Sequence, residues 1–131
     1  MTTAFDRWIR MMEVGSHEGL WELLDPDCVF WSPVVHTPQV GRPISHAYLS
    51  AAGEVFHDGF HYTRTVVQGD QGVFEFECAM DGIKVNGVDM ITIRDGLIVD
   101  FKVMVRPLKA INMVHQKMMA MLEKSKEPLK Q

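Results

Sequence analysis

The sequence predicts an α+β domain in which a curved, mostly antiparallel sheet wraps around N-terminal helices as a cone-like barrel, with a further helix at the C-terminus. Apolar residues recur with helical spacing in much of residues 4–56, and their period changes to two from residue 60 onward. Tight-turn sequences then separate strand-like segments, which is typical of antiparallel strands joined by hairpins. Helices followed by a run of strands indicate the α+β class.

Helices are expected over residues 4–14, 17–24, 43–56 and 108–123, where apolar side chains follow helical spacing. Gly15 ends the first helix, and Ser16 is expected to cap the second. Pro43 and Pro107 stand where each later helix begins, a position that tolerates proline because its missing N–H has no partner there.

Strands are expected over residues 28–35, 60–68, 73–80, 83–93 and 97–106. Asp25-Pro26-Asp27 is expected to form a turn before the first strand. Pro33 interrupts this strand or places it at a sheet edge, because proline has no N–H to donate to a neighbouring strand.

Size and composition fit one domain, over residues 1–123, followed by a charged tail over residues 124–131. The chain has 131 residues, and its 13 basic and 17 acidic side chains give a net charge of −4. It has neither the basic stripe of a nucleic-acid-binding protein nor an apolar run long enough to span a membrane. Two cysteines make no disulfide framework, and the first residues lack a signal pattern. We therefore expect a cytoplasmic protein with no nucleic-acid or membrane partner.

The turn sequence Asp81-Gly82 fixes the register of the two central strands. A two-residue hairpin at this position pairs Met80 with Ile83, and Phe74 with Asp89. One face of the pair then carries almost only apolar side chains, with Asp89 as its single charged residue.

The next turn allows two registers. A two-residue loop at Asp95-Gly96 would place Asp100 and Lys102 on the apolar face, whereas a three-residue loop that includes Arg94 would place Leu97, Val99, Phe101, Val103 and Val105 there. Register follows the hydrophobic pattern when one face is buried, so we expect the three-residue loop. Asp89 then lies opposite Phe101, and Ile98 lies on the outer face.

The order of these elements resembles the nuclear transport factor two-like superfamily, which includes ketosteroid isomerases and SnoaL-like polyketide cyclases. The resemblance covers about residues 4–115. It rests on two N-terminal helices, the segment Asp25-Pro-Asp-Cys-Val-Phe-Trp-Ser-Pro-Val34, the helix start Gly41-Arg42-Pro43, and the segment Asp89-Met-Ile-Thr-Ile-Arg-Asp-Gly-Leu-Ile-Val99. It implies an apolar cavity, and a homodimer formed through the outer sheet face, where Val88, Met90, Ile98 and Met104 are expected.

The resemblance also implies roles for three positions. Asp89 falls where ketosteroid isomerases keep a protonated aspartic acid that donates to the substrate oxygen. Their tyrosine donor falls at Trp8 and their general base falls at Ser32. A serine at its free pKa cannot abstract a carbon-bound proton without a partner, so the usual isomerase mechanism is not expected.

Asp89 is the candidate acid or polar anchor, and His36 or His46 is the candidate base, because histidine titrates near neutral pH. The expected ligand-binding residues are Trp8, Met12, Phe30, Ser32, Phe74, Phe76, Ile91 and Phe101. No metal site and no cofactor are expected.

Three functions remain open. One is a cofactor-free isomerase, cyclase, dehydratase or hydrolase that acts on a small apolar molecule. The second is a non-catalytic module that binds such a molecule. The third is a structural or assembly domain that acts through dimerisation.

Overall fold

The computed structural model describes residues 3–130, with side chains up to residue 124. Its elements in chain order are α1 (Ala4–Val14), α2 (Leu20–Leu23), β1 (Leu24–Trp31), β2 (Gln39–Val40), α3 (Arg42–Val55), β3 (His61–Gln68), β4 (Gln71–Met80), β5 (Ile83–Arg94), β6 (Leu97–Arg106) and α4 (Leu108–Lys130). This is the predicted α+β class.

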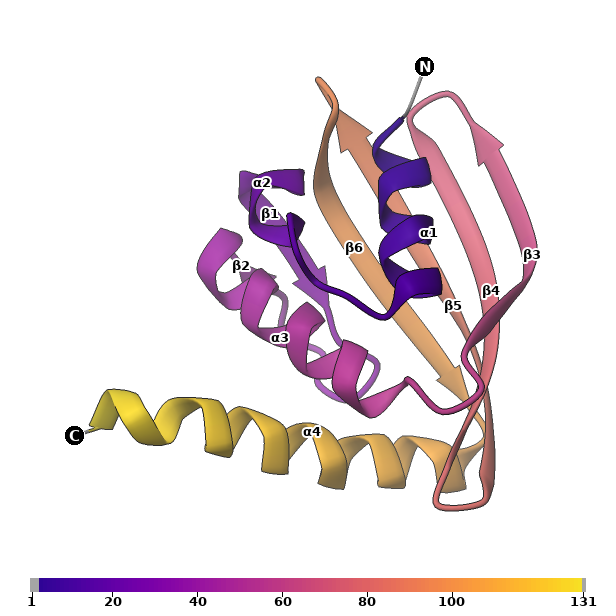
Figure 1. Ribbon diagram of the computed structural model, residues 1–131, viewed down its shortest axis with the longest axis vertical. Helices are drawn as coiled ribbons and strands as arrows, with labels where there is room; N and C mark the ends of the chain where they lie inside the picture. The colour runs from indigo at the N-terminus through magenta and orange to yellow at the C-terminus, as the bar shows by residue number, and fades with distance from the viewer. Residues whose placement is uncertain (1–2, 131) are drawn as a thin grey trace.

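The strands form one curved, unclosed sheet in the order β2-β1-β6-β5-β4-β3. All neighbouring pairs are antiparallel except β1 and β6, which are parallel. Helices α1 and α3 lie across one face of the sheet, and α4 crosses below it (Figure 1). The sheet therefore forms one wall of the interior, and α1 and α3 form the other.

Helix α1 has the predicted bounds because both of its ends are capped. The Thr3 hydroxyl accepts from the Asp6 N–H at 3.1 Å, and the Asp6 carboxylate accepts from the Thr3 N–H at 3.0 Å. At the other end Gly15 takes a left-handed φ of 72°, which glycine adopts without a steric penalty.

The segment between α1 and α3 departs from prediction. The second helix is limited to α2, and its cap position is Gly19, because the Ser16 hydroxyl bonds only to the N–H of Glu18 in a local turn. The residues 25–27 belong to β1, where the register against β6 shifts between Leu24 and Val29. A bulge replaces the expected turn, so β1 starts earlier and ends at Trp31 instead of continuing to residue 35.

The β4–β5 hairpin has the predicted register. Met80 pairs with Ile83 and Phe74 pairs with Asp89. Asp81 and Gly82 have φ values of 50° and 83°, and positive φ at both central residues is the signature of the tight turn that joins twisted antiparallel strands.

The prediction for the β5–β6 register was wrong. Arg94 pairs with Leu97, so the loop has two residues, and Asp95 and Gly96 again both have positive φ. A register shift beyond this turn leaves Val99 as an extra residue in β6, since Thr92 pairs with Asp100 while Ile93 pairs with Ile98. The bulge keeps the apolar face continuous without the longer loop.

This bulge corrects two further expectations. Asp89 lies opposite Val103 instead of Phe101, and Ile98 is fully buried instead of lying on the outer face. Phe101 and Val103 still face the interior, as predicted, because they follow the bulge.

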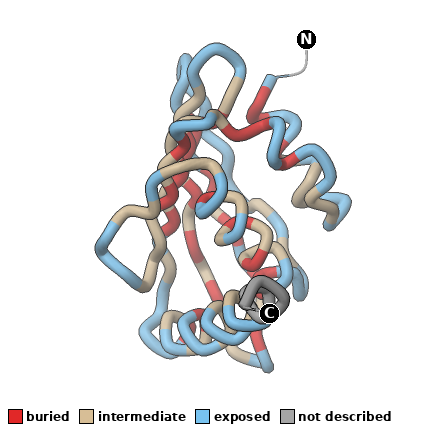
Figure 2. Tube along the Cα trace, turned by 90° about the vertical axis from the view of Figure 1, so that its left-hand side faces the viewer, coloured by how far each residue is buried: buried red, intermediate tan, exposed pale blue. Residues whose placement is uncertain are grey.

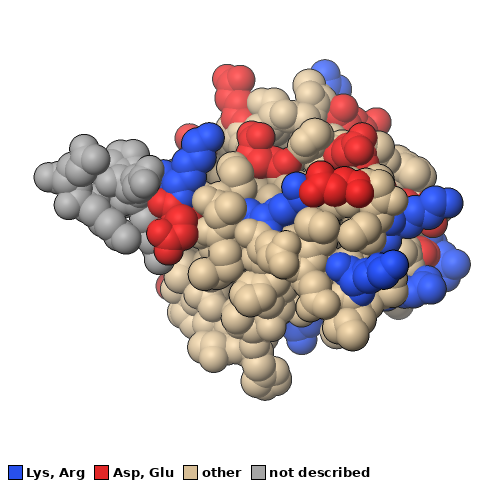
Figure 3. Space-filling view, turned by 90° about the horizontal axis from the view of Figure 1, so that it is seen from below, with Lys and Arg blue, Asp and Glu red and all other residues tan. Residues whose placement is uncertain are grey.

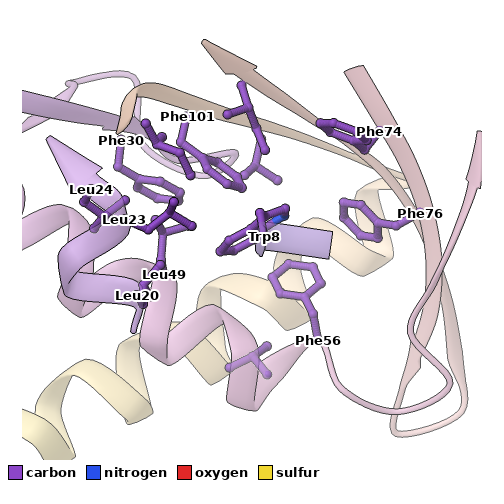
Figure 4. Packing of buried hydrophobic residues seen from close by; sticks show 14 of the residues in the cluster. Trp8, Leu20, Leu23, Leu24, Phe30, Leu49, Phe56, Phe74, Phe76 and Phe101 are labelled. Atoms are coloured by element: carbon purple, nitrogen blue, oxygen red, sulfur yellow. The ribbon is translucent and has the colours of Figure 1, made fainter. Parts of the chain in front are cut away.

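The hydrophobic core lies where the helices face the sheet, as the buried segments in Figure 2 show. Trp8 of α1 lies between Phe101 of β6 and Phe56 in Figure 4, and its ring meets Phe101 edge-on with centroids 4.8 Å apart. In the described part of the chain, no helix is long and apolar enough to cross a membrane. The face that includes α4 carries acidic and basic side chains around a broad uncharged area (Figure 3).

Candidate functional site

A pocket of about 480 Å³ lies between the two helices and the sheet. Helix α1 and the residues after it contribute one wall, and the C-terminal half of α3 contributes the other. Four residues of β4, β5 and β6 form the sheet side: Phe76, Asp89, Phe101 and Val103. The volume is within the range of small-molecule sites, which is roughly 300–1,000 Å³.

Asp89 is the polar centre of the sheet side, and its residue is only 5% exposed. Its Oδ2 accepts a hydrogen bond of 2.6 Å from the Tyr62 hydroxyl. The same hydroxyl oxygen accepts a 2.8 Å bond from the indole N–H of Trp8. Helix α1 and strand β3 therefore hold one oxygen of a carboxyl group that projects from β5.

The second oxygen of Asp89, Oδ1, has no hydrogen-bond partner among the described residues. Asp89 lines the pocket. No polar side-chain atom that is fully buried in the described chain lacks a partner, so Oδ1 is accessible from the pocket. This oxygen can therefore bond to a molecule that occupies the pocket.

Burial determines the protonation of this carboxyl group. Removal from water raises the pKa of Asp89 to about 7, against a smaller opposing effect of the Tyr62 hydrogen bond. Burial and the neighbouring Asp89 also hold the pKa of Tyr62 well above its usual value, so Tyr62 stays a donor. Near neutral pH, Asp89 is present both as a carboxylic acid that can donate and as a carboxylate that can only accept.

The structure brings together Asp89 and half of the expected ligand-binding residues. Trp8, Met12, Phe76 and Phe101 line the pocket. Phe30, Phe74 and Ile91 lie instead in the closed core, where each is at most 2% exposed. These three point to the correct side of the sheet, but neighbouring side chains cover them.

Ser32 lies outside the pocket as well. It follows the end of β1, and its hydroxyl accepts from the N–H of Val34 at 3.0 Å. The position where the resemblance implied a general base is therefore engaged in a local turn.

The two candidate bases lie away from Asp89. His36 is exposed in the loop between β1 and β2. His46 packs edge-on against Trp21, with ring centroids 5.4 Å apart, and burial lowers its pKa. Neither histidine lines the pocket, whereas His17 and His57 do. The structure therefore brings neither candidate base to Asp89: His36 lies in a loop at the β2 edge of the sheet, and His46 lies in α3.

Tyr62 is the functional residue that the sequence did not reveal. An uninterrupted ladder from the Gly69-Asp70 turn would pair Tyr62 with Glu77 and place it on the outer face. The register shifts between Tyr62 and Arg64, so Tyr62 pairs with Phe76 and points inward. Period-two alternation gives no signal of this bulge.

The family comparison adds to this geometry. The family model described as a SnoaL-like domain matches residues 5–101, about three-quarters of the chain. The chain belongs to the SnoaL-like domain family. A solved structure described as an NTF2-like protein from Mesorhizobium loti is 24% identical and shares the fold, as the resemblance predicted, with a TM-score of 0.70 and coverage of 79% of this chain and 88% of its own.

Two solved structures resemble this SnoaL-like domain over nearly its whole length. One is described as a steroid delta-isomerase from Pseudomonas aeruginosa. It is 34% identical, covers 93% of this chain and 90% of its own, and has a TM-score of 0.89. The other is an uncharacterised protein with a cystatin-like fold from Silicibacter pomeroyi. It is 30% identical, covers 99% of this chain and 92% of its own, and also has a TM-score of 0.89.

A more distant structure shares the fold alone. It is described as a putative polyketide cyclase from Sinorhizobium meliloti, with 18% identity, a TM-score of 0.63, and coverage of 76% of this chain and 92% of its own. No curated protein matches the chain.

The SnoaL-like domain offers hydrogen bonding and acid–base chemistry at one point of an apolar pocket. Among the described residues, no group of three His, Cys, Asp or Glu side chains lies close enough to hold a metal ion. The chemistry that Asp89 supports is donation or acceptance of a proton at its Oδ1.

Proposed function

We propose that this SnoaL-like domain binds a small, mostly apolar, uncharged molecule in the pocket, and that protonated Asp89 donates a hydrogen bond to an oxygen of that molecule. The observation that carries the proposal is the arrangement of Asp89, whose Oδ2 is held by Tyr62 while Oδ1 faces the pocket. A hydrogen bond from Oδ1 to a ligand oxygen would form in a site largely removed from water, where such a bond is stronger than in bulk solvent.

The lining of the pocket favours uncharged ligands. Its middle is formed by apolar side chains, among them Trp8, Leu49 and Phe56. None of the described lining residues is Lys or Arg, while Glu13 and Glu54 both line it. An anionic ligand would meet acidic side chains and lose its hydration without a compensating cation.

Similarity to the Pseudomonas aeruginosa protein suggests the first ligands to test. That protein is described as a steroid delta-isomerase and is 34% identical to this chain. Steroid ketones combine a rigid apolar skeleton with a carbonyl oxygen, which suits a pocket with one buried donor. A hydrogen bond from Asp89 would also stabilise negative charge on that oxygen, which is what a cofactor-independent isomerase or cyclase requires.

A non-catalytic binding module is the second candidate, and Ser32 favours it. The hydroxyl of Ser32 accepts from the N–H of Val34 and does not line the pocket, so it supplies no base beside Asp89. The two candidates differ in one measurement. In heavy water an enzyme would exchange the hydrogens next to the ketone of a bound steroid, whereas a binding module would leave them in place.

The binding experiment uses dihydrotestosterone, a saturated steroid with a ketone at one end and a hydroxyl at the other. Calorimetric titration at pH 6 and pH 8 is expected to show about tenfold weaker binding at pH 8, because most Asp89 has then lost the proton that it donates. Asp89→Asn keeps an N–H donor of similar shape, and its affinity is expected to be the same at both pH values. Equal affinities of the wild type and this variant at both pH values would refute a role for Asp89 in recognition.

We also infer that the domain forms a homodimer through the outer face of the sheet. Val66, Val73 and Met104 are each at least 40% exposed there. A shallow hollow on this face is bordered by Val73, Val88 and Met104. Covering such a patch would remove apolar surface from water.

Sedimentation velocity tests this inference. The wild type is expected to associate as its concentration rises, and Met104→Glu is expected to weaken the association while the exposed control Met119→Glu on α4 does not. A wild type that stays monomeric at all concentrations would exclude the dimer.

A further inference from the structure

Trp8 is the first member of a hydrogen-bonded chain that ends at Asp89. Its indole N–H donates to the hydroxyl oxygen of Tyr62 at 2.8 Å, and this hydroxyl lies 2.6 Å from Oδ2 of Asp89. Trp8 and Asp89 are both buried. The three side chains come from α1, β3 and β5, so only the tertiary structure brings them together.

The chain has a fixed direction, because an indole N–H can donate but not accept. The Trp8 N–H occupies an acceptor site of the Tyr62 oxygen, so a Tyr62 hydrogen turned toward Trp8 would lie against the hydrogen of the indole. Among the described residues, Asp89 is the only other hydrogen-bonding partner of this hydroxyl. The Tyr62 hydrogen therefore points to Oδ2 of Asp89, and Oδ2 is the acceptor.

This direction determines which oxygen of neutral Asp89 carries the proton. A neutral carboxyl group has one hydrogen, and its carbonyl oxygen is a better acceptor than its hydroxyl oxygen. Because Oδ2 accepts from Tyr62, the proton is expected on Oδ1, the oxygen that is accessible from the pocket. Oδ1 then donates, which suits a ligand oxygen that only accepts, such as that of a ketone.

The N–H of Trp8 is engaged and does not serve a ligand directly. Trp8 lines the pocket, but its single donor is bonded to Tyr62. The resemblance to ketosteroid isomerases implied a donor to the ligand at this position. In this chain the donor reaches the ligand site only through Tyr62 and Asp89.

We propose that Trp8 is a positioning residue, which orients the Tyr62 hydroxyl so that neutral Asp89 presents a donor to the pocket and the site selects a ketone over the alcohol of the same skeleton. This inference rests on the proposed function, because it assumes that a molecule binds at Asp89. An alcohol oxygen can also accept from Oδ1. Its own hydrogen then finds no acceptor at Asp89, since Oδ2 is bonded to Tyr62.

Two steroids with a single oxygen test the proposal, androstanone and androstanol. They share one saturated skeleton, with a ketone in the first and a hydroxyl group on the same carbon in the second. Equilibrium dialysis at pH 6, where most Asp89 keeps its proton, measures their dissociation constants. The wild type is expected to bind the ketone about tenfold more tightly, the factor that corresponds to one unsatisfied hydrogen-bonding group.

Trp8→Phe removes the N–H and lets the Tyr62 hydrogen turn away from Asp89. Oδ2 can then carry the proton and Oδ1 can accept, so the variant is expected to bind the two steroids equally. Lost packing around the smaller ring would weaken both steroids alike, so the ratio reports the hydrogen bond. Trp31→Phe is the matched control, because the Trp31 N–H donates to Asp100 at 2.7 Å and Trp31 does not line the pocket; the tenfold ratio should be retained.

A second replacement of Trp8 serves where Trp8→Phe does not fold. Benzothienylalanine at position 8 has the shape of tryptophan with a sulfur atom in place of the N–H, and it is expected to lose the preference while the packing is kept. The infrared carbonyl stretch of bound androstanone is a further readout. It should lie at a higher frequency with either replacement than in the wild type, because the ketone then accepts a weaker hydrogen bond.

The outcomes distinguish the two proposals. A wild type that binds both steroids equally, or replacements of Trp8 that keep the tenfold preference, would overturn the positioning role. In that case the proposed function stands if dihydrotestosterone binding depends on pH in the wild type and not in Asp89→Asn. A wild type that binds none of the three steroids overturns both proposals.

Discussion

Asp89→Asn is expected to stabilise the protein, and by more at high pH than at low pH. The substitution replaces a buried carboxyl group by a neutral amide of nearly the same shape. The amide oxygen can still accept from the Tyr62 hydroxyl, which lies 2.6 Å from Oδ2 in the wild type. What the variant loses is the ability to ionise inside the protein.

The expected magnitude follows from the pKa of Asp89, which burial raises from 3.8 to about 7. Below pH 4 both the folded and the unfolded chain carry the proton. Between pH 4 and pH 7 the unfolded chain loses it while the folded chain keeps it, so the free energy of unfolding falls by about 1.4 kcal/mol per pH unit. Above pH 7 both states are ionised and the loss levels off at about 4 kcal/mol.

Asparagine does not titrate, so the stability of the variant minus that of the wild type should rise with pH. Roughly 2.5 kcal/mol of this rise is expected between pH 5 and pH 8. Urea unfolding curves at pH 5, 6, 7 and 8 measure the free energy of unfolding of both proteins. Subtracting the wild-type value from that of the variant removes the contribution of all other titrating groups, because both proteins contain them. Asp70→Asn, at an exposed aspartate in the β3–β4 turn, is the control and should show a much smaller trend. A stability difference that is flat with pH, or that falls, would show that Asp89 is not a destabilised buried carboxyl group.

Two other substitutions test neighbouring features. Tyr62→Phe removes the donor that lowers the pKa of Asp89, so this pKa should rise above about 7. The carbon-13 chemical shift of the Asp89 carboxyl group measures the pKa during a pH titration. An unchanged or lower titration midpoint would contradict the hydrogen bond. Gly87→Ala places a Cβ 2.3 Å from Cζ of Phe76 and should cost about 1–3 kcal/mol in urea unfolding. Gly87 does not have the positive φ that would strain any larger residue, so a cost close to zero would argue against crowding at this position.

Much of the fold was predictable because its local signals agree with its tertiary structure. Helix α1 ends at Gly15, and the Asp81-Gly82 turn sets the β4–β5 register. The errors arise where a bulge inserts one residue into a strand. The bulge at Val99 compensates for the short turn between β5 and β6. No residue type in the sequence marks this bulge, because the extra residue can be recognised only from the pairing of β6 with β5.

The site was predictable only in part for the same reason. Asp89 could be placed because its strand continues without a bulge from a well-marked turn. Tyr62 could not, because the bulge next to it reverses the face on which it lies. The packing of His17 against Gly53 joins residues distant in sequence, which alternation and turn signals do not report.

The energetics of Asp89 connect its stability to its function. A carboxyl group whose raised pKa is expected to lower the stability of the folded chain by about 4 kcal/mol above pH 7 is not explained by folding, because asparagine would keep the Tyr62 hydrogen bond without that cost. Asparagine cannot deliver a proton, and a carboxylic acid with a pKa near neutrality can. The expected gain in stability of Asp89→Asn and its expected loss of pH-dependent binding are therefore two measurements of one property, the proton on Asp89. If the variant is more stable and also binds every ligand with the pH dependence of the wild type, this link between stability and recognition fails.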